Sequence, residues 1–152
     1  MDNIDVKAAT KKGIMVCNVP AGNTISACEH TFGLILSLLR NIPQAHNALK
    51  EGRWDRKKYK GKELYGKKLG IVGMGRIGTE VALRAKAFNM DILVSGPYIT
   101  QERVSDIGVQ ILSFDELLKE SGIVTLHLPV NDKTRGLFDK KTISKMKKTH
   151  IL

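Results

Sequence analysis

The sequence predicts an α/β fold in which helices cover both faces of a doubly wound parallel sheet. Apolar segments of strand length alternate along the chain with segments of helical periodicity. A glycine-rich turn at residues 73–78 directly follows one such strand and opens a helix. The chain has 152 residues, of which 42% are hydrophobic, so it can form one globular domain with a core.

The N-terminal residues predict a helix and a strand in close succession. A short helix over residues 5–12 is expected to end at Gly13, since glycine readily breaks helical structure. Residues 14–18 then have the composition of a strand. Pro20 and Gly22 predict a loop before the next helix.

A long helix is predicted after this loop. Ser26 and Glu29 have the spacing of a capping box, in which each side chain accepts from the other residue's backbone N–H. Pro43 is expected to kink the helix and Gly52 to end it. The apolar face of the helix consists of Phe32, Ile35, Leu36 and Leu39.

The second half of the chain carries most of the predicted sheet. Residues 53–68 are basic and poorly periodic, which predicts an irregular arm that includes Trp54. Strands are then expected at 68–72, 91–95, 109–112 and 123–128, and helices at 76–88, 115–120 and 139–146. Ser113 and Glu116 form a second capping box. Another apolar run begins at Ile151, so we expect a sheet that is incomplete at its C-terminus.

The formal net charge is +10, and most of the excess lies in residues 50–68 and 140–148. Such a charge suits anionic partners, although two solvated basic surfaces would also account for it. Aromatic residues are only 5% and the sequence has no zinc-finger or RNP pattern, so nucleic acid is not an expected partner.

Cys17 and Cys28 lack metal-site spacing and are expected to be small buried residues. No apolar stretch has the length of a signal peptide or a membrane span, and the expected location is cytoplasmic.

The glycine-rich turn predicts a binding site for a dinucleotide. Gly73 permits a tight turn, Gly75 leaves room for a pyrophosphate, and Gly78 lets the helix pack on the strand. The free N–H groups and the positive end of the helix then hold the phosphates. Arg76 can add a charge-assisted contact. The alternative is a turn whose glycines serve packing alone.

The end of the following strand departs from an ordinary NAD site. An acidic residue is expected there to bind the adenosine ribose, but Gly96 occupies the position. Loss of that acceptor would weaken binding by about 1–3 kcal/mol. No arginine follows directly, so the sequence gives no clear sign of a switch to NADP, and NAD is the expected cofactor.

With these motifs, the chain resembles the D-isomer-specific 2-hydroxyacid dehydrogenases along all 152 residues. The motifs that carry the resemblance are DNID at 2–5, AATKKGI at 8–14, NVPAGN at 18–23, EGRW at 51–54, GMGRIG at 73–78 and HLP at 127–129. The resemblance is strongest to the members that oxidise 3-phosphoglycerate with NAD in L-serine biosynthesis. It implies that residues 1–19 end a substrate domain and that residues 20–152 form a truncated, Rossmann-like NAD-binding domain.

The resemblance also implies roles for individual residues in cofactor binding. The backbone at Arg76 and Ile77 would contact the dinucleotide, and Leu128 and Pro129 would lie against its adenosine. Leu128 stands where the family often has threonine, so a hydroxyl contact would be lost. Gly96 stands where the family has its ribose-binding aspartate.

The catalytic residues of the family have no counterpart in this sequence. Its arginine, glutamate and histidine would all lie beyond Leu152, so the chain alone is expected to be inactive. None of the four histidines matches the catalytic one, and packing or backbone bonding is expected for His127 and a structural role for His30. Asn23 corresponds to a loop asparagine near the substrate, with capping of the loop as the alternative.

Three functions therefore remain open. The first is an NAD-dependent oxidoreductase acting on a small phosphorylated 2-hydroxy acid, with the activity belonging to a longer parent enzyme. The second is a non-catalytic dinucleotide-binding or dimerising module from a truncated or decayed gene. The third and least favoured is nucleic-acid binding through the basic arm. Residues 26–65 correspond to the family's dimer contacts, so a homodimer is expected, unless Trp54 simply pins the arm onto its own domain.

Overall fold

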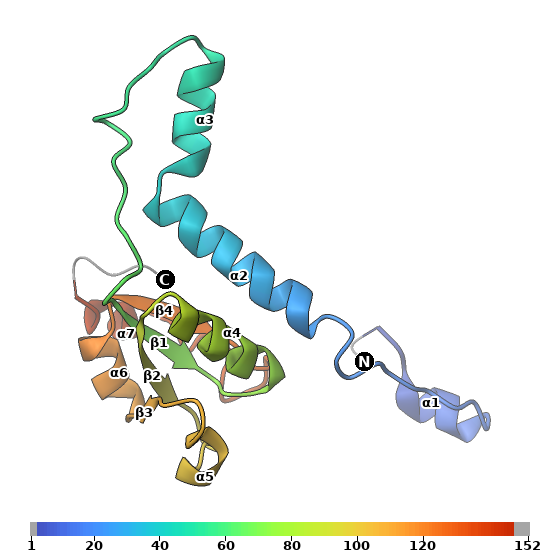
Figure 1. Ribbon diagram of the computed structural model, residues 1–152. Coiled ribbons are helices and arrows are strands. Elements are labelled where there is room, and N and C mark those ends of the chain that lie inside the picture. Colours follow the sequence, from blue (N-terminus) through green and yellow to red (C-terminus); the bar gives the residue numbers. More distant parts are fainter. Residues whose placement is uncertain (1–2, 148–152) are drawn as a thin grey trace.

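The computed structural model describes residues 3–147, and Figure 1 shows one sheet with helices on both of its faces. Its four parallel strands have the order β3-β2-β1-β4. The strands are β1 Lys68–Val72, β2 Asp91–Ser95, β3 Gln110–Ile111 and β4 Ile123–Leu126. The predicted α/β class with a parallel sheet is therefore confirmed.

Alternate side chains of the strands enter two separate cores, as expected for a sheet that is covered on both faces. The helices that flank the sheet are α2 Thr24–Leu39, α4 Arg76–Ala87, α6 Phe114–Glu120 and α7 Lys140–Ser144. Ile71 and Val94 belong to the larger core, together with apolar residues of α2 and α4. Val72 and Leu93, their neighbours in sequence, belong to the smaller core with residues of α6.

Near the N-terminus the structure confirms the predicted helix and contradicts the predicted strand. The helix is α1 (Val6–Lys11), which the Asp5 side chain caps by accepting a backbone hydrogen bond at 2.9 Å. Residues 14–18 are irregular, and the Ile14 and Met15 side chains are exposed. No strand within residues 3–147 pairs with this segment, so its backbone lacks the partner that a strand requires. Figure 1 shows α1 lying apart from the sheet.

The helix α2 starts earlier than the capping-box prediction requires. It begins at Thr24 with Asn23 as its N-cap, so Ser26 lies inside the first turn. There the Ser26 hydroxyl donates to the Asn23 carbonyl oxygen at 3.1 Å. The box predicted at Ser26 and Glu29 is wrong, because a serine inside a helix bonds back to a carbonyl. The apolar face is confirmed by the packing of Phe32, Ile35, Leu36 and Leu39.

The predicted kinked helix is in fact two helices, α2 and α3 (Ile42–Lys50). Between them Asn41 adopts a left-handed conformation with φ of 53°, which ends the run of helical dihedrals. Pro43 lies in the first turn of α3, where the N–H that proline lacks has no intrahelical partner to lose. Gly52, with φ of 75°, follows the end of α3 as predicted.

The arm over residues 53–67 contains neither helix nor strand, which confirms the predicted irregular segment. It passes the end of α2, where Lys62 N–H donates to the Leu39 carbonyl oxygen at 2.8 Å. The Trp54 side chain is 74% exposed. The alternative in which Trp54 pins the arm onto its own domain is therefore wrong.

The remaining elements follow the predicted order, with β1 and β2 at the predicted bounds. The second capping box is confirmed, since Glu116 N–H donates to the Ser113 hydroxyl and Ser113 N–H donates to the Glu116 carboxylate. β4 ends at Leu126, earlier than predicted, because β1 gives way to the glycine turn there. β3 and α7 are also shorter than predicted. A short helix α5 (Gln101–Val104) was not predicted, and the run at Ile151 lies outside the described residues.

Candidate functional site

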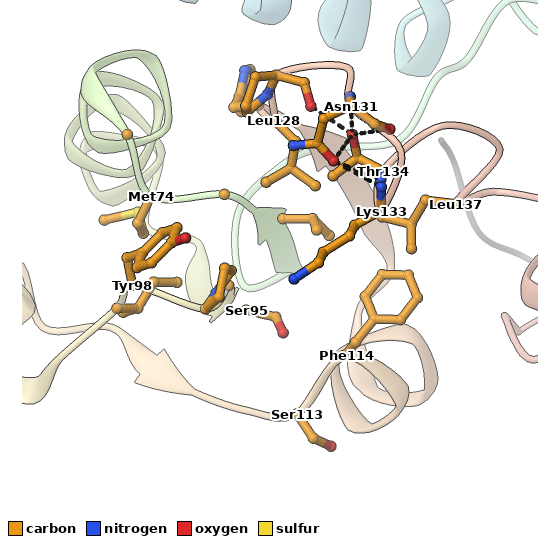
Figure 2. Close-up of a pocket in the computed structure, with 18 of the residues that line it drawn as sticks. Met74, Ser95, Tyr98, Ser113, Phe114, Leu128, Asn131, Lys133, Thr134 and Leu137 are labelled. Atoms are coloured by element: carbon orange, nitrogen blue, oxygen red, sulfur yellow. Dashed lines mark hydrogen bonds between the residues drawn. The ribbon is translucent and has the colours of Figure 1, made fainter.

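A cavity of about 750 Å³ lies at the carboxyl ends of β1, β2 and β4 (Figure 2). Ligands of open parallel sheets bind at this edge, because the loops that follow the strands converge there. The lining is mostly apolar and includes Ile99, Leu112 and Phe114 from the segments around β3. The glycine-rich turn and the His127–Leu128–Pro129 segment also line it.

The three glycines of the turn have different surroundings. Gly73 has φ of 101°, and a Cβ there would overlap the carbonyl oxygen of His127. A Cβ at Gly78 would overlap the carbonyl oxygen of Gly73. A Cβ at Gly75 would meet no protein atom within 4 Å, and Gly75 lines the cavity. Packing therefore accounts for Gly73 and Gly78 but not for Gly75, which leaves open space beside the cavity.

The turn leads directly into the N-terminus of α4. Gly75 is the N-cap and has no side chain to accept hydrogen bonds, and the Thr79 N–H donates to its carbonyl oxygen at 2.9 Å. The N–H groups of Arg76, Ile77 and Gly78 belong to the first turn, where helical backbone donors have no partner within the helix. These donors and the positive end of the helix dipole suit an anion.

The Arg76 side chain does not line the cavity. Its guanidinium Nη1 instead donates to the carbonyl oxygen of Pro20 at 3.3 Å. Ile77 is half-buried against the larger core and also contributes only its backbone to this end of the helix. The expected charge-assisted contact of Arg76 with a ligand is thus replaced, in this structure, by a link to the preceding loop.

Gly96 lies next to the glycine turn, just after the end of β2. A Cβ at Gly96 would lie 3.2 Å from Ile99 Cδ1 and 3.7 Å from Gly73 Cα. Among the described residues that line the cavity, none is an aspartate or a glutamate. The position that the resemblance assigns to a ribose-binding carboxylate therefore lines the cavity but carries no side chain.

Leu128 and Pro129 line the cavity as expected. His127 Nε2 lies 3.1 Å from the Thr125 hydroxyl oxygen. Burial lowers the pKa of His127, so its imidazole is neutral near pH 7. A neutral ring bonded to Thr125 fits the packing role that the sequence predicts for it.

The loop after β4 contains site residues that the motif search missed. Asn131 Oδ1 accepts hydrogen bonds from Lys133 N–H at 2.9 Å and from Thr134 N–H at 3.1 Å. The Thr134 hydroxyl donates to the Pro129 carbonyl oxygen at 2.6 Å. Asn131, Lys133 and Thr134 all line the cavity (Figure 2). The Asn-x-x-Thr spacing just beyond a strand end was the available signal, since such residues commonly fix a turn.

Other predicted residues lie away from the cavity. Asn23 is the N-cap of α2 but makes no side-chain capping bond, so the capping alternative is not realised by its side chain. His30 is exposed on α2. Cys28 is buried, and burial raises the pKa of its thiol, whereas Cys17 is exposed, so the expectation that both are buried is wrong for Cys17.

Residues 3–147 contain neither a candidate metal site nor a candidate membrane span. No group of three or more histidine, cysteine, aspartate or glutamate side chains there could hold a metal ion. No helix in that part of the chain is long and apolar enough to cross a membrane.

Comparisons with known proteins agree with this geometry. Residues 32–152 match the family described as D-isomer specific 2-hydroxyacid dehydrogenase, NAD binding domain. D-3-phosphoglycerate dehydrogenase of Bacillus subtilis (strain 168) is 53% identical over 148 residues, which are 97% of this chain and 28% of that protein. The chain therefore spans little more than a quarter of this relative's length.

Solved structures have the same arrangement. D-lactate dehydrogenase from Escherichia coli, without ligand, superposes with a TM-score of 0.91 at 28% identity, over 99% of this chain and 48% of that one. D-lactate dehydrogenase from Aquifex aeolicus, solved with NAD and lactic acid, has a TM-score of 0.84 at 35% identity, over 97% of this chain and 44% of that one.

Proposed function

The chain belongs to the D-isomer specific 2-hydroxyacid dehydrogenase family, and we propose on that basis that residues 20–152 hold a nicotinamide dinucleotide in the cavity beside Gly75. Residues 1–19 would then belong to the end of a substrate domain. The observation that carries the proposal is the open space at Gly75, because no packing contact accounts for a glycine there. A pyrophosphate that approaches the backbone does account for it.

The residues present fit such a ligand in most respects. The first-turn N–H groups of α4 at Arg76, Ile77 and Gly78 would hold the phosphates. Leu128 and Pro129 would lie against the adenosine, in the mostly apolar part of the cavity. Gly96 is the exception, because it offers no acceptor to the ribose hydroxyls. The absence of that acceptor costs about 1–3 kcal/mol of binding free energy.

For the parent enzyme we propose NAD-dependent oxidation of a 2-hydroxy acid, specifically 3-phosphoglycerate on the way to L-serine, in the cytoplasm. The support for this substrate is the 53% identity with the Bacillus subtilis relative. The bound cofactor supplies the hydride acceptor. The substrate alcohol also needs a base, and His127 does not suit that role, because it is bonded to Thr125. The arginine, glutamate and histidine that bind substrate and move the proton would come from outside these 152 residues.

The test is a fluorescence titration of the purified chain with NADH. We expect saturable binding by the unsubstituted 152-residue chain (the parent chain). Binding by Gly96→Asp should be tighter, because the new carboxylate can accept hydrogen bonds from the ribose hydroxyls. The added side chain is accommodated by a small shift of Ile99, whose flexible tip is its nearest neighbour. Absence of saturable binding in both proteins, with intact thermal unfolding transitions, would contradict the proposal.

A second candidate, self-association as a dimerising module, has an observation of its own. Apolar side chains on α2, α3 and the arm are largely exposed, and they are Leu34, Leu38, Ile42, Leu49 and Trp54. Clustered exposed apolar residues mark interaction surfaces more often than scattered ones do. We propose that residues 26–65 form a homodimer contact; none of these residues lines the dinucleotide cavity.

A further inference from the structure

We propose that this site accepts a dinucleotide that carries a phosphate on the 2′-hydroxyl of the adenosine ribose, and that Lys133 binds this phosphate. The inference rests on the proposed function, because it concerns one end of the same ligand. It changes the expected cofactor from NAD, with NADP less favoured, to both NAD and NADP.

The first argument is the charge of the cavity. A carboxylate at the end of the second strand selects NAD, because it accepts from the ribose hydroxyls and repels a 2′-phosphate. Gly96 removes that carboxylate, and none of the other described lining residues is acidic. Lys133 is the only lysine or arginine among the described residues that line the cavity. The charges of the described lining residues therefore attract a phosphate and do not repel it.

The second argument is the fixed backbone of the loop that carries Lys133. Its backbone N–H donates to Asn131 Oδ1 at 2.9 Å, and the neighbouring Thr134 hydroxyl ties the same loop to the Pro129 carbonyl oxygen. These bonds hold the loop against the end of β4. Figure 2 shows the Lys133 side chain extending from the loop into the cavity, toward the end of β2 at Ser95.

The third argument is the availability of the ammonium group. Within residues 3–147, no carboxylate forms an ion pair with Lys133, whereas Lys68 and Lys145 are paired with Glu120 and Asp115. The Lys133 side chain is exposed and lines the cavity, and an ammonium without a counterion there attracts an anionic group of the ligand. Gly96 lines the same cavity and contributes no side chain to it.

Inspection of the strand end alone misses this residue. An arginine directly after Gly96 would indicate NADP recognition, and none follows. Lys133 reaches the same cavity from a loop that is distant in sequence, so only the fold brings the two positions together.

The test compares NADH and NADPH in parallel fluorescence titrations of the whole 152-residue chain. The variants are Lys133→Met and, as a matched control, Lys57→Met, which removes one charge from the exposed arm. We expect the parent chain to bind NADPH at least as tightly as NADH. Lys133→Met should weaken NADPH binding by about three- to tenfold and leave NADH binding nearly unchanged, because only NADPH carries the extra phosphate. The advantage of NADPH should also shrink as salt is added.

Each outcome decides between the two proposals. Binding of NADH with NADPH at least tenfold weaker would overturn this inference and leave dinucleotide binding intact. Equal loss of both ligands in Lys133→Met would overturn the assignment of Lys133 to the 2′-phosphate. Binding of neither ligand by a chain that unfolds cooperatively would overturn the proposed function and this inference with it. Selective loss of NADPH in Lys133→Met, but not in Lys57→Met, would support it.

Discussion

Arg76 Nη1 donates a hydrogen bond to the carbonyl oxygen of Pro20 at 3.3 Å, across 56 positions of the sequence. The bond joins the first turn of α4, beside the glycine turn, to the loop that precedes α2. The segment before α2 is thereby held next to the proposed phosphate site. Both groups are exposed, so the bond contributes modestly to stability.

Replacing Arg76 with methionine should release the loop over residues 19–24. We expect faster amide hydrogen exchange there, with the free energy of unfolding lowered by only about 0.5 kcal/mol. Exchange measured by mass spectrometry gives the first quantity and urea denaturation the second. The control is Arg135→Met, in an exposed loop. Unchanged exchange at residues 19–24 in Arg76→Met would show that the bond does not restrain the loop.

Gly73 should be required for folding. An alanine there would have to adopt φ near 101° and would overlap the His127 carbonyl oxygen. We expect Gly73→Ala to lower the free energy of unfolding by about 2 kcal/mol or more. Urea denaturation measures this loss. Stability equal to that of the parent chain would mean that the turn does not have the described conformation.

His127 should make stability depend on pH. Burial lowers its pKa below about 6.5, the ordinary value in an unfolded chain. The unfolded state therefore binds more protons near pH 6, and the free energy of unfolding falls as pH drops from about 7 toward 5. His127→Gln should show a shallower fall than the parent chain. Identical pH profiles for the parent chain and His127→Gln would contradict the assignment.

The apolar surface of α2 and α3 should mediate self-association. Leu38 is 52% exposed on α2, and Leu38→Lys places a charge among the exposed apolar residues of that surface. We expect the parent chain to sediment as a dimer and the variant as a monomer, because a buried unpaired charge opposes association. Leu83→Lys, at a position on α4 that is 45% exposed, is the matched control. A parent chain that sediments as a monomer would exclude this contact.

The extent to which the sequence predicted the fold differs between segments for physical reasons. The predicted bounds of β1, β2 and α4 agree closely with the structure. The apolar runs of the two strands end abruptly at Gly73 and near Gly96, and β1 and β2 pair with each other within the described chain. Residues 14–18 have the composition of a strand, but composition does not provide a pairing partner. Ser26 and Glu29 satisfy a spacing rule, yet the helix had already begun at Thr24.

The candidate site was predicted in the same uneven way. Gly73, Gly75, Gly96, Leu128 and Pro129 meet at one cavity because they follow parallel strands of the same sheet. Lys133 was missed, because its place in the cavity depends on the hydrogen-bonded loop after β4 and not on any motif.

The central claim is that the absence of a side chain at Gly75 leaves room for a dinucleotide. The variant Gly75→Val tests this claim directly. The backbone there has φ of −76° and ψ of −165°, which valine readily adopts, and a Cβ meets no protein atom within 4 Å. The control is Gly33→Val, at an exposed position of α2 that is equally open. NADH titration of both variants should show Gly75→Val weakened by at least about tenfold, with an unchanged thermal unfolding midpoint, and Gly33→Val binding like the parent chain. NADH binding by Gly75→Val that equals the parent's would contradict the claim.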